Sequence, residues 1–275
     1  MEYNYLKTLF LCVLALVGAN AVAQDNYEEV YHADCYVDGI YYNLHGNCAT
    51  VTSRTTTFCY FIDDWARNIY HYYYSSDYSG DVCIPSSITV NNKTYYVTSI
   101  NAGAFSNCTN LTSVTIPNSV SSIGLRHNLE VGDWTLLYDE GAFEGCSGLK
   151  SVTIGNGVTT IGNGAFGGCV NLSAVHITDL AAWCKIKFES SSSMYDYRGD
   201  YTYNEIYGIP IDYSSNPLYY AHHLYLNGKE IEHLFIPDGV TYINDGAFFG
   251  CTDLISVTIP NSVTSIEEYA FYYCI

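Results

Sequence analysis

Positive charge is scarce in this 275-residue chain, which has 10 Lys and Arg side chains against 28 Asp and Glu. The formal net charge is -18. A surface this acidic repels phosphate backbones and anionic lipid headgroups, so we expect neither nucleic acid nor an anionic membrane surface as a partner. Charged residues of both signs make up only 14% of the chain and apolar residues 48%, which predicts a folded core.

The sequence also lacks motifs that are typical of enzymes and cofactor-binding proteins. It contains no G-x-S-x-G nucleophile motif, no phosphate-binding G-x-x-x-x-G-K-[ST] loop and no D-x-[DN]-x-[DN]-G calcium loop. It has no C-x-x-C pair, and the adjacent residues His222 and His223 are poorly placed to hold one metal ion together. We therefore expect no catalytic residue, no cofactor and no metal site.

Long apolar runs are absent beyond the N-terminal end of the chain. Residues 1–23 combine a weak positive start at Lys7, an apolar stretch over residues 9–17 and an Ala-x-Ala motif. This pattern predicts a secretory signal peptide cut between Ala23 and Gln24, with an uncleaved anchor as the alternative. No later segment is apolar enough to cross a bilayer, so we expect a secreted or cell-surface protein.

What the chain does contain is an internal repeat. Val152–Ile161 and Val257–Ile266 share the pattern V-T-I-x-N-x-V-T-x-I, and each continues into an Ala-Phe-x-x-Cys block. Undisturbed copies are 23 residues apart, as from Cys146 to Cys169, within the range of leucine-rich repeats. The five blocks lie at Phe105/Cys108, Phe143/Cys146, Phe166/Cys169, Phe248/Cys251 and Phe271/Cys274.

The repeat predicts a β-rich leucine-rich-repeat solenoid. Val-Thr-Ile alternates apolar and polar side chains, which is typical of a strand with one buried face, and Pro, Asn or Gly then turns the chain. We therefore expect parallel strands stacked coil on coil, joined by short helical or 3-10 turns. Because stacked strands lie about 4.8 Å apart, the five Phe and five Cys side chains would form continuous buried columns.

Residues 84–275 resemble the BspA-type leucine-rich repeats of secreted and cell-surface proteins from host-associated microbes. The resemblance rests on the V-T-I-P-x-S-V-x-S-I and A-F-x-x-C blocks. It implies a solenoid fold, a surface location and a role in adhesion to host proteins or to other cells.

Four stretches depart from the repeat. Residues 24–83 do not match it and are expected to form a β-rich N-terminal cap. Insertions are expected at about residues 85–97, 124–139 and 178–233. Insertions in solenoids usually emerge on one face, which is often the binding face.

Short signals within these insertions predict local structure. Asn91-Asn92 and Asn227-Gly228 predict hairpin turns, and residues 178–184 predict the capped start of a helix. The chain stops at Ile275 without a C-terminal cap, which predicts either a fragment or an end covered by another chain.

Ten cysteines remain once Cys12, in the signal region, is set aside, and nine of them fall into two groups. The five repeat cysteines are expected to be reduced and to act as small buried apolar side chains. Whether Cys35, Cys48, Cys59 and Cys83 form disulfides in the cap region stays open, because a secreted chain permits them and spacing does not define the pairing.

Tyrosine is abundant, with 29 residues. Most are expected to fill strand positions, where aromatic residues are favoured. Others lie in the longest insertion among Ser and Gly, a mixture typical of binding loops, although a flexible loop without a ligand is the alternative. The candidate ligand contacts are Trp134, Tyr195, Tyr197, Tyr201, Tyr203 and Tyr207.

Together these features predict a protein-binding or adhesion module without catalytic activity. The expected ligand is a protein on a host or microbial surface. Two alternatives remain open: a structural spacer within a longer surface protein, and a carbohydrate-binding module that uses exposed Tyr side chains and Trp134.

Overall fold

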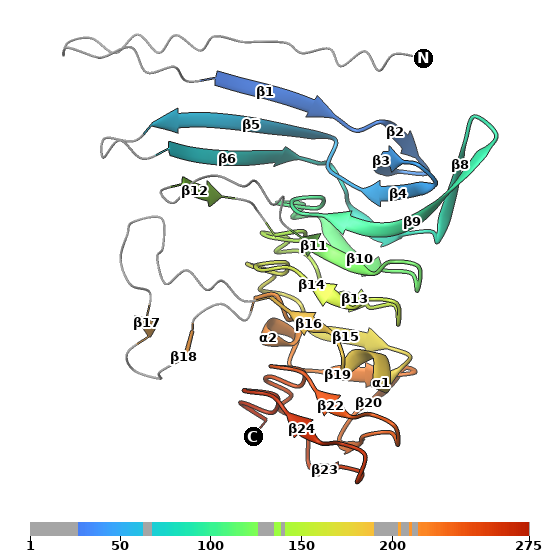
Figure 1. Ribbon diagram of the computed structural model, residues 1–275, viewed down its shortest axis with the longest axis vertical. Helices are drawn as coiled ribbons and strands as arrows, with labels where there is room; N and C mark the ends of the chain where they lie inside the picture. The colour runs from blue at the N-terminus through green and yellow to red at the C-terminus, as the bar shows by residue number, and fades with distance from the viewer. Residues whose placement is uncertain are drawn as a thin grey trace.

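The computed structural model describes residues 27–62, 68–125, 135–138, 141–189, 203–204, 209–210 and 214–274. The chain forms a stack of short coils that descends from the N-terminal strands to the C-terminal end (Figure 1). This is the predicted β-rich solenoid.

One face of the stack is a six-stranded sheet in the order β20-β19-β15-β13-β10-β7. Its pairings are parallel except at the β19–β20 hairpin, and equivalent repeat residues are in register, with Val152 opposite both Val114 and Val175. Val82 also lies opposite Val114, so the first coil begins before residue 84. The strands are β7 (Gly80–Cys83), β10 (Leu111–Thr115), β13 (Ser151–Thr153), β15 (Ala174–Ile177), β19 (Leu224–Leu226) and β20 (Lys229–Glu230).

A second face is an eight-stranded sheet in which N-terminal strands continue directly into repeat strands. β4 pairs with β9 in parallel, and β11, β14 and β16 follow with Val51, Ile100, Ile123 and Ile161 in register. The N-terminal region therefore belongs to the same hydrogen-bonded stack. The strands are β2 (Cys35–Val37), β3 (Ile40–His45), β4 (Cys48–Val51), β8 (Ser87–Val90), β9 (Lys93–Asn101), β11 (Ser122–Leu125), β14 (Thr160–Ile161) and β16 (Lys187–Phe188).

A four-stranded sheet, in the order β1-β5-β6-β12, extends to one side at the N-terminal end of the stack (Figure 1). Its last strand comes from the second insertion and pairs with β6 in parallel, so this insertion enlarges the N-terminal sheet. Residues 24–83 were expected to be rich in β-strand, and most of the described residues in this range lie in strands, including β3 and β6. The strands are β1 (Tyr27–His32), β5 (Thr55–Ile62), β6 (Asn68–Ser75) and β12 (Thr135–Tyr138).

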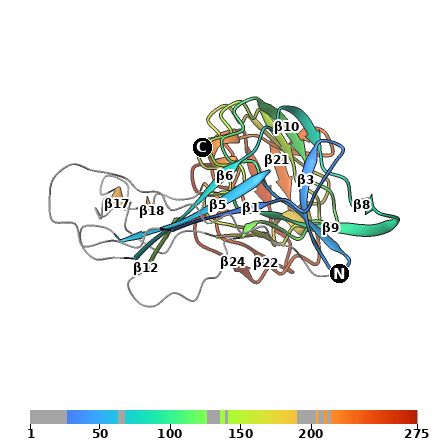
Figure 2. The ribbon, with the colours of Figure 1, turned by 90° about the horizontal axis from the view of Figure 1, so that it is seen from above.

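The last two coils form two small parallel sheets, β21–β23 and β22–β24, which lie on different sides of the stack when it is seen from above (Figure 2). Val257 and Ile266 occupy core positions of the repeat, yet they are 36% and 47% exposed, whereas Val152 and Ile161 are buried. The strands are β21 (His233–Phe235), β22 (Tyr242–Ile243), β23 (Ser256–Thr258) and β24 (Ser265–Ile266).

The long insertion, expected over residues 178–233, is partly built into the stack. Its first part forms helix α1 (Leu180–Trp183), with Asp179 as the N-cap, and then β16. Its last part forms helix α2 (Leu218–Ala221) and β19, which pairs with β15. The short strands β17 (Tyr203–Asn204) and β18 (Ile209–Pro210) pair between these two parts and lie to one side of the stack (Figure 1).

Both predicted hairpin turns are confirmed. Asn91 and Asn92 have φ of 50° and 63° and join β8 to β9, while Asn227 and Gly228 have φ of 51° and 78° and join β19 to β20. A two-residue turn of this type requires positive φ at both positions, which Asn and Gly adopt more readily than other residues. The predicted helix start is confirmed by the hydrogen bond that the Ala182 N–H donates to the Asp179 carboxylate at 3.0 Å.

Buried aromatic rings form a column inside the stack. Phe105 and Phe143 lie 4.8 Å apart between ring centroids, and Phe143 and Phe166 lie 5.1 Å apart, with nearly parallel planes. Tyr78 continues the column at 4.4 Å from Phe105 and donates its hydroxyl hydrogen to the Thr52 carbonyl. This tyrosine connects the N-terminal region to the repeat core.

The column is not continuous over all five phenylalanines, which corrects the expectation from the repeat. Phe248 and Phe271 stack at 5.2 Å in the last two coils. Between Phe166 and Phe248 the chain inserts the coil that contains α2, where Leu218 is fully buried in the core. Tyr219 stacks on Phe249 of the next coil, so Leu218 takes the position in its own coil that Phe248 takes in the next one.

The repeat cysteines form a second internal column beside the rings. The Cys146 thiol donates to the Phe105 carbonyl at 2.9 Å, and the Cys169 thiol donates to the Phe143 carbonyl at 3.1 Å. Each thiol thus satisfies a carbonyl of the preceding coil. The nine cysteines whose side chains the structure describes are free thiols: Cys35, Cys48, Cys83, Cys108, Cys146, Cys169, Cys184, Cys251 and Cys274.

Candidate functional site

The ligand contacts predicted from the sequence fall almost entirely outside the described residues. Tyr203 has a described backbone, in β17, where it pairs with Pro210 of β18. The other positions lie outside the described ranges, as do both residues of the predicted signal cleavage site: Trp134, Tyr195, Tyr197, Tyr201, Tyr207, Ala23 and Gln24.

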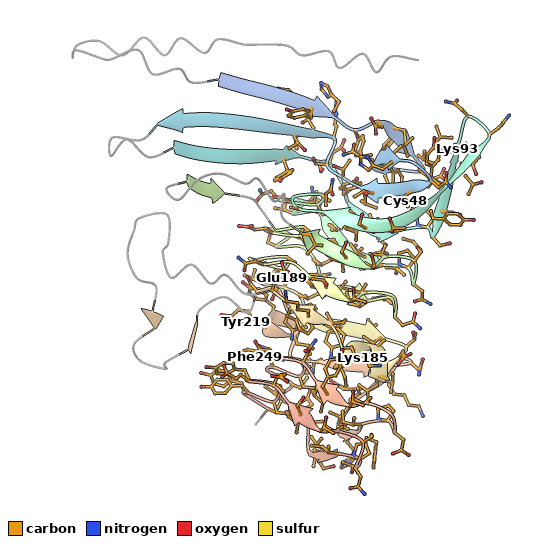
Figure 3. The ribbon with its side chains drawn as sticks, in the orientation of Figure 1. Cys48, Lys93, Lys185, Glu189, Tyr219 and Phe249 are labelled. Atoms are coloured by element: carbon orange, nitrogen blue, oxygen red, sulfur yellow. The ribbon has the colours of Figure 1, made fainter. Side chains whose placement is uncertain are left out.

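The described residues contain a different concentration of aromatic side chains, at one corner of the last coils. Figure 3 shows Tyr219 and Phe249 one above the other at the edge of the stack, on the side toward β17 and β18. We call this surface the aromatic corner. It consists of Tyr219, Tyr220, Phe249, Tyr269, Tyr272 and Tyr273.

Three rings of the aromatic corner stack on one another in successive coils. Phe249 stacks on Tyr219 and on Tyr272, with 5.9 Å between ring centroids in both pairs and interplanar angles of 21° and 24°. The remaining rings contact these three edge to face, as in the 4.5 Å pair of Tyr272 and Tyr273. Both arrangements are favoured by aromatic rings and hold the side chains in a defined orientation.

The repeat sequence explains why the rings gather here. The two residues between Phe and Cys in each Ala-Phe-x-x-Cys block lie at a corner of the coil, next to the buried ring. The first blocks carry Ser106-Asn107, Glu144-Gly145 and Gly167-Gly168, whereas the last two blocks carry Phe249-Gly250 and Tyr272-Tyr273. Because equivalent positions of successive coils lie next to each other, the aromatic residues at these positions form one continuous group of rings.

Two tyrosines of the corner adopt a backbone conformation that is unfavourable for them. Tyr269 and Tyr273 have φ of 55° and 60°, in the left-handed region. Gly246 and Gly250 occupy the equivalent positions one coil earlier, with φ of 62° and 73°. A left-handed conformation costs a residue with a side chain about 1–2 kcal/mol, and glycine avoids this cost.

The corner combines a buried centre with partly exposed edges. Phe249 is only 4% exposed and anchors the surrounding rings, while Tyr273 is 41% exposed. Tyr219 and Tyr272 have intermediate exposure. Tyrosine offers an apolar face and a hydroxyl group with few rotatable bonds, which suits it to contact surfaces.

Carboxylates lie beside the aromatic corner. Burial raises the pKa of Asp245, and the neighbouring carboxylates of Glu268 and Glu267 raise it further. Both glutamates are exposed and directly precede Tyr269 in the chain. The corner is therefore a rigid aromatic surface with an acidic edge, a combination that fits a partner with apolar and positively charged groups.

The internal thiols have no comparable access to a partner. Burial raises the pKa of Cys108 to about 11 and those of Cys169 and Cys184 to about 12. Because the thiolate is the nucleophilic form, these neutral and enclosed thiols are structural groups.

The fold and the repeat define a leucine-rich-repeat protein, and the aromatic corner is its most distinctive described surface. The chain belongs to the BspA type leucine rich repeat family, whose model matches six copies over residues 72–127, 136–208 and 211–275. No curated protein is significantly similar in sequence. Among the helices of the described ranges, none has the length and apolar character needed to span a membrane.

Several solved leucine-rich repeat proteins are similar to this chain. One from Bacteroides ovatus is 23% identical, with 88% of this chain and 45% of that chain covered and a TM-score of 0.42. A leucine rich cell surface protein from Faecalibacterium prausnitzii is 25% identical, with coverages of 86% and 47% and a TM-score of 0.38. The T. pallidum leucine rich repeat protein is 20% identical, with coverages of 76% and 82% and a TM-score of 0.36. The chain thus spans less than half the length of the first two proteins.

Proposed function

We propose that this protein is a secreted or cell-surface binding module without catalytic activity, and that the aromatic corner is its contact surface for a protein ligand. The observation that carries the proposal is the left-handed backbone of Tyr269 and Tyr273. The preceding coil has the same backbone conformation but places glycine there, and a strained conformation in a residue with a large side chain is typical of functional positions.

The composition of the corner favours a protein ligand. Tyrosine and phenylalanine are enriched at the centres of protein interfaces, where large rings are buried in pockets of the partner. The acidic edge near Glu267 and Glu268 favours a partner that carries Lys or Arg around an apolar contact. Membership of the BspA-type family and the signal-like residues 1–23 support a location outside the cell.

The test is a binding screen of the mature chain, residues 24–275, against immobilised host extracellular-matrix proteins and a glycan array. Tyr273→Asn removes one ring and keeps a residue that tolerates the left-handed region, as Asn107 does at the equivalent position of an earlier coil. Tyr96→Asn is the matched control, because Tyr96 is 59% exposed and lies in β9.

We expect the wild-type chain and Tyr96→Asn to bind the same matrix protein and Tyr273→Asn to bind it at least about tenfold more weakly, as expected for an interface residue that contributes more than 1.4 kcal/mol. Equal binding by all three proteins would refute the corner as the contact surface. Binding to glycans alone would favour the carbohydrate-binding alternative, and no binding by the wild-type chain would favour a spacer.

A second variant tests the long insertion separately. Replacing residues 190–213 with a short Gly-Ser linker keeps β16 and also Ser214, whose carbonyl accepts a hydrogen bond from the Phe166 N–H at 2.8 Å. Loss of binding in this variant, with Tyr273→Asn unaffected, would move the contact surface to the loop tyrosines. Unchanged binding would remove the insertion from the proposed function.

A further inference from the structure

Three side chains that could bind a metal ion converge where the long insertion rejoins the repeats. His223 directly precedes β19, Glu230 ends β20, and Asp253 follows Cys251 in the next coil. The His223 Nδ1 atom lies 2.7 Å from Glu230 Oε1 and also contacts Asp253 Oδ2. One ligand atom from each residue lies within 4.8 Å of the other two.

The fold brings these residues together although they are distant in the sequence. The hairpin turn at Asn227 and Gly228 places Glu230 opposite Tyr225, beside the strand that His223 precedes. The chain segments around residues 219–223 and 249–253 lie side by side, because Tyr219 stacks on Phe249 and the His222 ring nitrogen contacts the Gly250 carbonyl oxygen. His222 and His223 therefore face different partners.

The hydrogen bonds within this cluster do not satisfy both carboxylates. A ring nitrogen carries at most one hydrogen, so Nδ1 can donate to Glu230 or to Asp253 but not to both. The Asp253 Oδ2 atom is shielded from solvent, and its one recorded polar contact is His223 Nδ1, so it accepts no hydrogen bond when Nδ1 donates to Glu230. Glu230 has a further partner in the Tyr225 hydroxyl. An acceptor that is removed from water and left without a partner is unfavourable.

We propose that His223, Glu230 and Asp253 bind a divalent transition-metal ion of the Zn²⁺ class. An imidazole nitrogen and two carboxylate oxygens are ligands that such ions accept, whereas Ca²⁺ and Mg²⁺ prefer sites built from oxygen alone. A dication balances the two carboxylates and contacts both, so that Glu230 and Asp253 no longer compete for the single Nδ1 hydrogen. Three protein ligands leave at least one position of a tetrahedral ion for water.

The site crosses a junction in the fold. The six-stranded sheet ends at β20, and the two-stranded sheet β21–β23 begins just after it. His223 and Glu230 belong to the first part and Asp253 to the second, so a bound ion would link the two. The linked segments also carry Tyr219 and Phe249, and the ion would thereby stabilise the position of the aromatic corner. Metal binding itself does not depend on the proposed adhesive function.

Isothermal titration of the chelator-treated mature chain with ZnCl₂ tests the site. His223→Gln and Asp253→Asn each remove one ligand, and His45→Gln is the control, because His45 is an exposed histidine at the end of β3. We expect the wild-type chain and His45→Gln to bind one Zn²⁺ with the same affinity. Each ligand variant should bind at least about tenfold more weakly, given that loss of even an outer-shell partner costs 10–100-fold.

The melting temperature provides a second measurement in the same four proteins. Zn²⁺ should raise it in the wild-type chain and in His45→Gln, and should raise it less in the two ligand variants. Equal Zn²⁺ affinity in all four proteins would overturn the proposal and assign the ion to other thiols or carboxylates. An equal response to CaCl₂ would overturn it too, because it would indicate general binding to an acidic surface.

Discussion

Replacing Phe143 with alanine perturbs the centre of the internal ring column. Phe143 is fully buried and has a stacked ring on each side, at 4.8 and 5.1 Å. Removing a buried phenylalanine costs about 3–5 kcal/mol, and each aromatic pair contributes about 0.5–1.5 kcal/mol beyond the buried area. Because two pairs are lost, we expect a decrease in the free energy of unfolding near the upper end, at about 4–5 kcal/mol.

Phe271 provides the matched comparison within the same chain. It is partly buried in the last coil and stacks on Phe248 alone among the described rings, at 5.2 Å. Each coil of a solenoid gains stability from its immediate neighbours, so a side chain with one neighbouring coil contributes about half as much as one with two. Phe271→Ala should therefore cost about 2 kcal/mol.

Urea unfolding followed by circular dichroism gives both values, provided that the transitions are reversible and have similar slopes. The reasoning predicts a clearly larger loss for Phe143→Ala than for Phe271→Ala. Equal losses, or a loss below about 1 kcal/mol for Phe143→Ala, would refute the stacked column as a main source of stability.

Three further predictions concern the thiols, the contacts between coils and the long insertion. Burial raises the pKa of Cys169 from 9.0 to about 12. The unfolded chain then loses this proton first, so stability falls between pH 9 and 12, and Cys169→Ala should reduce the slope of that loss by about 1.4 kcal/mol per pH unit in urea titrations. A Cβ atom on Gly155 would lie 2.5 Å from the Pro117 carbonyl carbon of the preceding coil, so Gly155→Ala should destabilise the chain by about 1–3 kcal/mol, and an unchanged melting temperature would contradict this contact. Trp183→Phe removes the 2.8 Å hydrogen bond from Nε1 to the Ala247 carbonyl, which should cost about 1–3 kcal/mol in the same assay.

The sequence predicts the stacked coils from two independent features of the repeat, its alternation of apolar and polar residues and its fixed period. Alternation in Val-Thr-Ile specifies one buried strand face, and the fixed period places Val152 opposite Val175 in the next coil. The hairpin turns were predictable for a local reason, since Asn and Gly at adjacent positions specify the backbone that such a turn needs.

The break in the ring column was harder to predict. Helix α2 contributes Leu218 at the level where the other coils place phenylalanine, and its sequence does not match the Ala-Phe-x-x-Cys block. A buried leucine can replace a buried phenylalanine in the core, but the Ala-Phe-x-x-Cys motif is then lost. A search for that motif therefore does not detect this coil. The same coil was therefore assigned to an insertion.

The aromatic corner carries a signal that sequence reasoning did not use. The first variable position of the Ala-Phe-x-x-Cys block is aromatic in both of the last two blocks, and the second is aromatic in the last block, where Tyr273 follows Tyr272. The stacking of Phe249 and Tyr272 follows from the period already recognised. The convergence of His223 with Glu230 and Asp253 has no such signal, because it depends on the hairpin and on the coil that follows it. The predicted contacts in the long insertion remain predictions.

Photo-cross-linking at position 273 tests the central claim most directly. The variant replaces Tyr273 with p-benzoylphenylalanine, keeping an aromatic ring at the exposed edge of the corner, and a second variant carries the same group in place of Tyr96. Each is irradiated with the matrix protein that the wild-type chain captures. The account predicts a covalent adduct from position 273 and none from position 96. An adduct from position 96 alone, or equal yields from both, would contradict it.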